Sequence, residues 1–325
     1  MALQMNPETP GRVLTSDRSG GLLLLKKSPG ITSFESLAIV KKALHTGKVG
    51  HTGTLDKFAS GLLIVLTGKA LKLAPWFSLC RKEYEGRIRF GLETDTLDPE
   101  GAPVAEGKIP SREDVEAALS GFRGQILQAP PAYSAVHVDG RRASDLARQG
   151  TAPEMKKRPV TVYSLEILSW DPPSATVRVC CSAGTYIRSL ARDIALAAGT
   201  RAHLSALVRT GIGGFRLDRA FDPEAYKGTG GADPGIAREL AAAVQPVKAE
   251  TFALLGLPAV FAKDETVKSL ILGRLSGSDI TDLGLPSDAG AAGVFSVKDG
   301  GEEELAAVLE KKSGKWGFGR VFAQN

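Results

Sequence analysis

Cysteine is scarce in this 325-residue chain, which contains three: Cys80, Cys180 and Cys181. Their number and spacing are too poor for a disulfide framework or a zinc site. The four histidines also never approach one another at the spacing of metal ligands. We therefore interpret the cysteines as reduced, buried small side chains and expect no metal.

Nucleotide-binding motifs are absent as well. The segment 68–70 lacks the Ser or Thr and the upstream glycine of a P-loop, and the glycines at 211–214 do not fit a dinucleotide fingerprint. The sequence thus predicts chemistry that amino-acid side chains carry out without a cofactor.

Long hydrophobic runs are also missing. No stretch reaches the roughly 18 apolar residues of a membrane span, and the first residues lack the order of a signal peptide. We expect a cytoplasmic protein that does not enter a membrane.

The charge is unevenly distributed. The formal net charge is +5, but residues 251–325 carry 8 Lys and Arg against 10 Asp and Glu, which leaves +7 for residues 1–250. If the partner is a polyanion, the N-terminal part supplies most of the attracting field.

One glycine-rich stretch, residues 50–61, precedes the apolar run from Leu62 to Leu66. Its glycines favour a tight loop, and the continuous apolar run favours a strand that is buried on both faces. Asp56 lies in this loop. It is either a turn or cap residue, which is common in such sequence, or a nucleophile or base at the mouth of a cleft. Spacing alone does not separate the two.

The stretch from Gly50 to Gly61 resembles the signature of the TruB family of tRNA pseudouridine synthases, in which the loop carries a single catalytic aspartate. Lys57 stands where the family usually has proline. Further segments resemble the other family motifs in the same order, so that the resemblance covers roughly residues 22–215. These segments are residues 26–33, residues 82–84 with 91–98, residues 184–189 and residues 204–211.

The resemblance implies roles for individual residues. Asp56 is the catalytic carboxylate, Arg188 pairs with it, and Tyr84 stacks on the target base and assists removal of the C5 proton. Substrate contacts are expected at His51, which enters the space that the flipped base vacates, and at Tyr186, Leu207 and Lys27. The long segment at about 124–159 corresponds to the family's thumb, a flap whose basic residues suit a phosphate backbone. Its RNA contacts are assigned to Arg141, Arg142, Lys156 and Lys157.

Local patterns predict the main elements. Strands are expected at 22–25, 62–66, 82–90 and 176–182, and the strict alternation of 82–90 turns Tyr84 inward. Helices are expected at about 33–44, 69–77, 112–120 and 185–199, followed by alanine-rich helical sequence up to Lys248. Short apolar runs between 257 and 322 predict a small β-rich module.

Together these features predict an α+β fold with a mixed, largely antiparallel sheet flanked by helices and a small C-terminal PUA-like β-barrel. The expected organisation is a loose tail at 1–21, a catalytic domain at 22–250 that folds without the rest, and an RNA-binding module at 251–325. The resemblance implies a monomer that flips a uridine out of the T loop of tRNA and isomerises it to pseudouridine at position 55. The alternatives are a non-catalytic RNA-binding or RNA-folding protein, and a synthase that acts on another RNA.

Overall fold

The structure is a computed structural model that describes residues 20–151, 153–226, 234–298 and 300–322. Almost all of the predicted N-terminal tail lies outside these residues. None of the helices in the described part has the length and apolar character that a membrane span requires.

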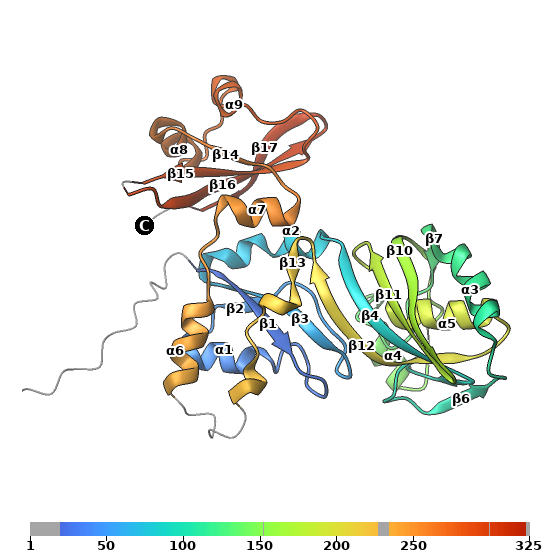
Figure 1. The fold of residues 1–325 in the computed structure, drawn as a ribbon. Helices are drawn as coiled ribbons and strands as arrows, with labels where there is room; N and C mark the ends of the chain where they lie inside the picture. The colour runs from blue at the N-terminus through green and yellow to red at the C-terminus, as the bar shows by residue number, and fades with distance from the viewer. Residues whose placement is uncertain (1–19, 152, 227–233, 299, 323–325) are drawn as a thin grey trace, which may run out of the picture.

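A nine-stranded sheet forms the body of the protein, with the order β1-β3-β12-β4-β11-β10-β7 (Figure 1). Strand β2 pairs with β3, and β13 pairs with β12. Every pairing is antiparallel except that of β3 with β12. The predicted mixed, largely antiparallel sheet is therefore confirmed. The strands are β1 (Leu22–Lys27), β2 (Val49–His51), β3 (Ser60–Thr67), β4 (Lys82–Phe90), β7 (Gly124–Gln128), β10 (Arg158–Asp171), β11 (Ser174–Cys181), β12 (Ala202–Ile212) and β13 (Phe215–Arg216).

The two strand patterns seen in the sequence have different places in this sheet. Strand β3 lies between β1 and β12 and is buried from Gly61 to Thr67, as its continuous apolar run predicts. In β4 the buried residues alternate with more exposed ones, and Tyr84 belongs to the buried set. Since β4 lies between β12 and β11, its inner face looks onto the main hydrophobic core.

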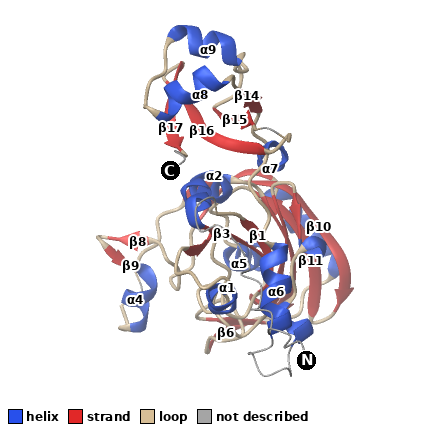
Figure 2. Ribbon diagram, turned by 90° about the vertical axis from the view of Figure 1, so that its left-hand side faces the viewer, coloured by secondary structure: helices blue, strands red, loops and turns tan. Residues whose placement is uncertain are grey.

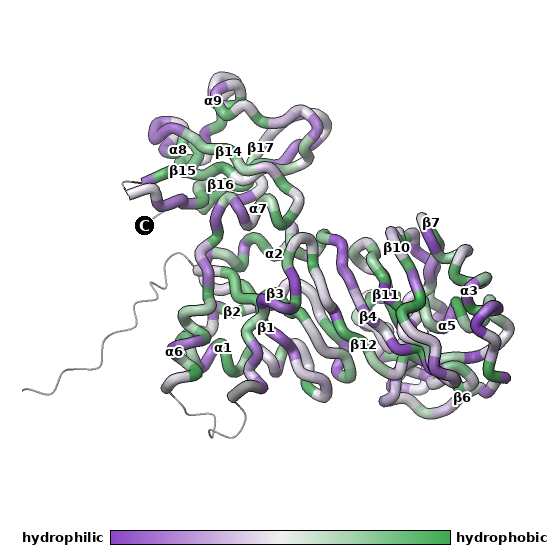
Figure 3. The backbone as a smooth tube through the Cα atoms, in the orientation of Figure 1, coloured by the Kyte–Doolittle hydropathy of each residue, from purple (hydrophilic) through white to green (hydrophobic). Residues whose placement is uncertain are grey.

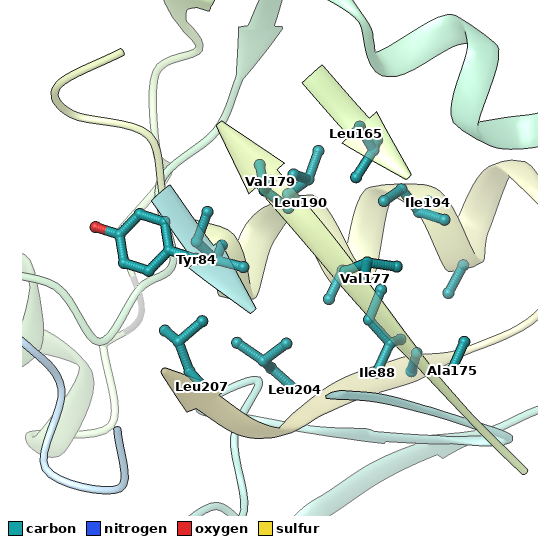
Figure 4. Packing of buried hydrophobic residues seen from close by; sticks show 14 of the residues in the cluster. Tyr84, Ile88, Leu165, Ala175, Val177, Val179, Leu190, Ile194, Leu204 and Leu207 are labelled. Carbon is teal, nitrogen blue, oxygen red and sulfur yellow. The ribbon is translucent and has the colours of Figure 1, made fainter. Parts of the chain in front are cut away.

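Helices cover the sheet. The main core lies between the sheet and the helices α3 (Arg112–Leu119) and α5 (Ile187–Ala197), where Leu190 and Ile194 of α5 pack among Leu165, Val177 and Val179 (Figure 4). A second cluster buries α1 (Leu37–Ala43) and α6 (Pro234–Ala243) against β1 and β3. The 3₁₀ turn Gly68–Leu73 and α2 (Ala74–Leu79) occupy the predicted 69–77 helix.

Helix α1 begins later than the sequence predicts. The backbone amide of Glu35 donates to Thr32 Oγ1 over 3.1 Å, and the amide of Thr32 donates to Glu35 Oε2 over 2.6 Å. These reciprocal bonds hold residues 32–35 as a turn, so that the helix starts at Leu37.

The predicted thumb contains secondary structure of its own. After β7, the short strands β8 (His137–Val138) and β9 (Arg141–Arg142) form a hairpin that continues into α4 (Ala143–Arg148). These elements project from the body of the molecule (Figure 2). A further hairpin, β5 (Leu92–Thr94) with β6 (Pro103–Glu106), precedes α3.

The C-terminal region forms a separate four-stranded sheet with the order β14-β15-β16-β17. Hydrophobic residues line β15 and β16, which supply its buried centre (Figure 3). This separate β-rich unit is consistent with the expected PUA-like domain. Its elements are β14 (Ala259–Phe261), α8 (Asp264–Ile271), α9 (Gly277–Leu283), β15 (Ala291–Val297), β16 (Glu303–Lys312) and β17 (Lys315–Val321).

A shared hydrophobic cluster joins this region to the body that the nine-stranded sheet forms. Phe77 of α2 and Phe215 of β13 belong to the same cluster as Phe252 of α7 (Ala249–Leu255) and Phe295 of β15. Phe252 and Phe295 pack edge to face with ring centroids 5.4 Å apart. The C-terminal region thus covers a hydrophobic face of the N-terminal body, a feature that the sequence did not indicate.

Removal of residues 249–325 is therefore expected to destabilise the N-terminal body, in contrast to the independent folding expected from the sequence. Phe77 is fully buried and Trp76 is 8% exposed in the intact chain, and both lose partners in the truncated protein. Exposing one such side chain costs roughly 1.5–3 kcal/mol, so the free energy of unfolding should fall by about 3 kcal/mol or more. Thermal and urea unfolding of both proteins would measure this loss. Equal stability would show that the body tolerates the exposed face.

Candidate active site

A two-fold contact between Asp56 and Arg188 forms the centre of the candidate site. Arg188 Nε donates to Asp56 Oδ2 over 2.9 Å, and Nη2 donates to Oδ1 over 3.0 Å. The Arg188 side chain is 5% exposed and that of Asp56 is 37% exposed. The buried guanidinium thus fixes the orientation of a carboxylate that a ligand can still reach. The predicted pairing of these residues is present in the structure.

Arg188 itself is held from every side. Nη1 donates to the Thr96 carbonyl over 2.7 Å and lies 3.3 Å from Asp98 Oδ2, while Nη2 also donates to the Tyr133 carbonyl over 3.0 Å. With the bonds to Asp56, hydrogen bonds use four of the five N–H groups of the guanidinium, and the second Nη1 donor lies beside the Asp98 carboxylate. The protein therefore holds Arg188 in an orientation that positions the Asp56 carboxylate.

Asp98 is a site residue to which sequence reasoning gave no role. Its side chain is 7% exposed and faces the same guanidinium as Asp56. The only available signal was its place at the end of the motif at 91–98. Because it is buried, Asp98 is suited to holding Arg188 rather than to contacting a substrate.

Lys27 lies under the loop that carries Asp56 and is fully buried. Its Nζ donates to the carbonyls of Ala59 over 2.6 Å, Ser28 over 2.9 Å and Lys57 over 3.2 Å. Burial lowers the pKa of Lys27 to about 8, although the nearby Asp56 raises it. The sequence-based expectation was a substrate contact, but the structure places the ammonium group where it ties the end of β1 to the loop just after Asp56, at Lys57 and Ala59.

Arg209 supports the other half of the loop and was also missed in the sequence. It is 1% exposed, and its guanidinium donates to the carbonyls of Leu62 over 2.8 Å and Gly53 over 3.0 Å. Gly61 has φ 110°, and a Cβ there would lie 2.4 Å from the Arg209 carbonyl oxygen. The glycine is therefore needed for the close approach of β3 and β12 beside the loop.

Tyr84 and Leu207 lie together at one end of the main core (Figure 4). Tyr84 on β4 is 9% exposed and Leu207 on β12 is 6% exposed. Burial raises the pKa of the Tyr84 hydroxyl, and the nearby Arg209 opposes this shift. The two strands pair directly, so that the sheet itself places both predicted residues at this position.

Tyr186 is the N-cap residue of α5, the helix that carries Arg188. The buried side chain of Gln128 accepts a hydrogen bond from the Tyr186 amide over 2.8 Å and donates to the Tyr186 carbonyl over 3.1 Å. Burial raises the pKa of the Tyr186 hydroxyl. Gln128, at the end of β7, thus anchors the start of α5 where the thumb leaves the sheet. Sequence reasoning assigned this glutamine no role.

The remaining predicted contacts differ in their surroundings. His51 is half-buried at the end of β2, and burial lowers its pKa. The four basic thumb residues are exposed: Arg141, Arg142, Lys156 and Lys157. Arg141 donates to Gln149 over 2.6 Å. None of these five side chains takes part in the Asp56–Arg188 contacts described above.

The described residues contain no group of three or more His, Cys, Asp or Glu side chains that could hold a metal ion. The three cysteines are free. Cys80 and Cys181 are buried, whereas Cys180 is half-buried.

Comparison with known proteins identifies the family. Residues 41–187 match the model described as "TruB family pseudouridylate synthase (N terminal domain)". The chain is 51% identical over 200 residues to tRNA pseudouridine synthase B of Borreliella burgdorferi (strain ZS7), a match that covers 61% of this chain and 71% of that protein. It is 44% identical over 214 residues to the protein of the same name from Treponema denticola, with 60% of each chain covered.

Solved structures resemble nearly the whole chain. A chain in "Crystal Structure of a Cbf5-Nop10-Gar1 Complex" has a TM-score of 0.66 and 27% identity, with 94% of this chain and 86% of that chain covered. A chain in "Structure of H/ACA RNP bound to a substrate RNA containing 2'-deoxyuridine" also has a TM-score of 0.66, with 25% identity and 96% and 88% covered. The Asp56 loop and Tyr84 lie within the region that matches the family model. The chain therefore belongs to the TruB family and is a pseudouridine synthase.

Proposed function

We propose that the protein converts uridine 55 in the T loop of tRNA to pseudouridine, with Asp56 as the catalytic carboxylate and without a cofactor. The observation that carries this proposal is the accessible Asp56 carboxylate in two-fold contact with buried Arg188. Relatives that are named tRNA pseudouridine synthase B support tRNA as the substrate class.

The reaction needs few groups. The N1–C1′ bond of uridine breaks, the uracil turns, and a C5–C1′ bond forms; C5 loses a proton, N1 gains one, and no electrons are exchanged. A glycosidase requires two carboxylates because one protonates a departing oxygen and the other attacks or activates water. Here the base stays in the pocket, so that a single accessible carboxylate suffices. The second carboxylate, Asp98, is buried against Arg188 and remains a positioning group.

The target base must leave its stack before Asp56 can reach the sugar, at a cost of a few kcal/mol that protein contacts offset. Tyr84 and Tyr186 are proposed to hold the flipped uracil, and His51 to enter the vacated space. The exposed basic residues of the thumb would bind the phosphate backbone. These assignments rest on the family resemblance and on the location of the residues around the Asp56 loop and the thumb.

The function can be tested with purified protein and unmodified tRNA that carries tritium at C5 of its uridines. Since C5 loses its proton, turnover should release one tritium per tRNA, and mapping should place pseudouridine at position 55. A tRNA with cytidine at position 55 is the matched control and should release none. Pseudouridine at another position or only in another RNA would refute the proposed site. Tight binding without any tritium release would favour the non-catalytic RNA-binding alternative.

Replacement of Tyr84 by phenylalanine separates two roles of this side chain. The variant keeps the aromatic ring for stacking and loses only the hydroxyl, which is proposed to assist removal of the C5 proton. We expect tRNA affinity within about twofold of the wild type and a single-turnover rate at least about tenfold lower. Tyr84→Leu, which removes the ring, should lose affinity as well. An unchanged rate for Tyr84→Phe would leave stacking as the role of the ring.

A further inference from the structure

One exposed surface beside the catalytic loop has no part in the site described above. It consists of Ile31, Phe34, Lys41 and Lys57, and we call it the Phe34 patch. We propose that the Phe34 patch binds the RNA strand next to the target nucleotide, with Phe34 stacking on a flanking base and Lys57 contacting a phosphate. This inference rests on the proposed function, because it assumes an RNA substrate at Asp56.

The patch is fixed to the loop that carries Asp56. Ser33 Oγ accepts a hydrogen bond from the Leu55 amide over 2.8 Å and donates to the Leu55 carbonyl over 3.1 Å. The Gly30 amide donates to the Lys57 carbonyl over 2.8 Å. Ser33 precedes Phe34 and Leu55 precedes Asp56, so these bonds place the exposed ring and the carboxylate on two adjoining turns.

The Phe34 side chain is 69% exposed, more than any other aromatic side chain among the exposed large hydrophobic residues described, and Ile31 is 38% exposed. The Lys41 ammonium lies 4.6 Å from the centroid of the Phe34 ring. An exposed aromatic ring with an adjacent cation is the combination on which single-stranded bases stack, because every base has a π-face and every nucleotide a phosphate. A flipped target also leaves its neighbours partly unstacked and available for such contact.

Charge on this surface favours a polyanion. Residues 31–57 contain four lysines and two acidic residues, Glu35 and Asp56. Glu35 is engaged by the amide of Thr32 within its own turn, and Asp56 by Arg188. The lysines in this segment thus outnumber its acids, and the side chains of Lys41 and Lys57 lie on the patch, with Glu100 as the further acid near Lys57.

Lys57 is the member closest to the chemistry. It follows Asp56 directly, so their Cα atoms are about 3.8 Å apart. Its side chain is 53% exposed, and its contact to Glu100 is a loose 3.8 Å pair of the kind that contributes little in water. When C1′ of a uridine lies at Asp56, the phosphates on either side of the same ribose lie close to the neighbouring residue, Lys57. Because the TruB family usually has proline at the position of Lys57, this phosphate contact would be a feature of this chain.

The test measures tRNA affinity over a series of salt concentrations, with every variant made in an Asp56→Asn background to prevent turnover. Phe34→Ala should weaken binding about tenfold without changing the slope of log affinity against log salt, whereas Phe34→Trp should retain affinity. Lys57→Met should reduce the slope by about 0.7, the value for one phosphate on a single strand, and Lys57→Arg should restore it. Tyr163→Ala and Lys108→Met, at exposed positions outside the patch, serve as matched controls and should bind like the parent.

Unchanged affinity for Phe34→Ala, or an unchanged slope for Lys57→Met, would overturn the inference. So would equal losses in the control variants, because they would indicate a general effect of surface changes. In each of these cases the parent still binds tRNA, and the proposed function stands. A wild-type protein that binds tRNA at no salt concentration would overturn both proposals.

Discussion

Asp56→Asn is expected to abolish pseudouridine formation while tRNA affinity changes by less than about tenfold, or 1.4 kcal/mol. Asparagine keeps the size of the side chain and one oxygen that can accept from Arg188, but it removes the negative charge and the nucleophile. Because the Asp56 loop is also held by Lys27 and Arg209, its conformation should survive the change. Tritium release from C5-labelled tRNA measures turnover, and equilibrium binding measures affinity.

Asp171→Asn provides the matched control for this experiment. Asp171 lies at the end of β10, its side chain is 81% exposed, and its contact is a surface pair with Arg87. The same chemical change there should leave turnover and affinity unaltered. Turnover retained in Asp56→Asn would end the mechanism proposed here, and equal loss in both variants would point to instability of the preparation.

The elements that the sequence predicted well are those whose pattern reflects a local environment. The apolar run of β3 and the alternation of β4 report directly which faces are covered, and both strands are found where they were expected. Asp56 and Arg188, which are 132 positions apart, were brought together only by the resemblance to a family, not by any pattern in the residues themselves.

The supporting residues could not be predicted because their partners are distant in sequence. Gln128 binds the backbone of Tyr186, and Arg209 binds the carbonyl of Gly53. A buried arginine looks like a surface arginine in the sequence, since nothing local marks its burial. The same reasoning explains Lys27, which was expected at the RNA and instead lies beneath the loop.

The junction with the C-terminal region shows a related limit. The net charge of the C-terminal region and the regular spacing of its short apolar runs are properties of that segment alone. They indicated a module that could be removed without harm to the rest. The cluster of Phe77, Phe252 and Phe295 depends on residues from both parts of the chain. Such a shared core is invisible until the two parts are placed together.

Arg188→Lys should leave tRNA affinity within about threefold and lower the rate of the bound complex by about 100-fold, or ~2.7 kcal/mol. Lysine keeps the charge, but its single ammonium nitrogen replaces a planar guanidinium with five N–H donors. It cannot contact both oxygens of Asp56 in the same fixed geometry while also reaching the carbonyls of Thr96 and Tyr133. The carboxylate should therefore remain present but lose its orientation, which affects the chemical step rather than binding.

Single-turnover kinetics over a range of enzyme concentrations separate these effects, because the plateau rate reports the bound complex and the midpoint reports affinity. Arg192→Lys is the matched control: Arg192 lies on the same helix, is half-buried, and pairs with Asp193. It should keep a plateau rate near that of the wild type, whereas a general loosening of α5 would lower both variants alike. If Arg188→Lys instead loses affinity at an unchanged plateau rate, Arg188 acts on the RNA backbone, and Asp56 owes its orientation to other groups.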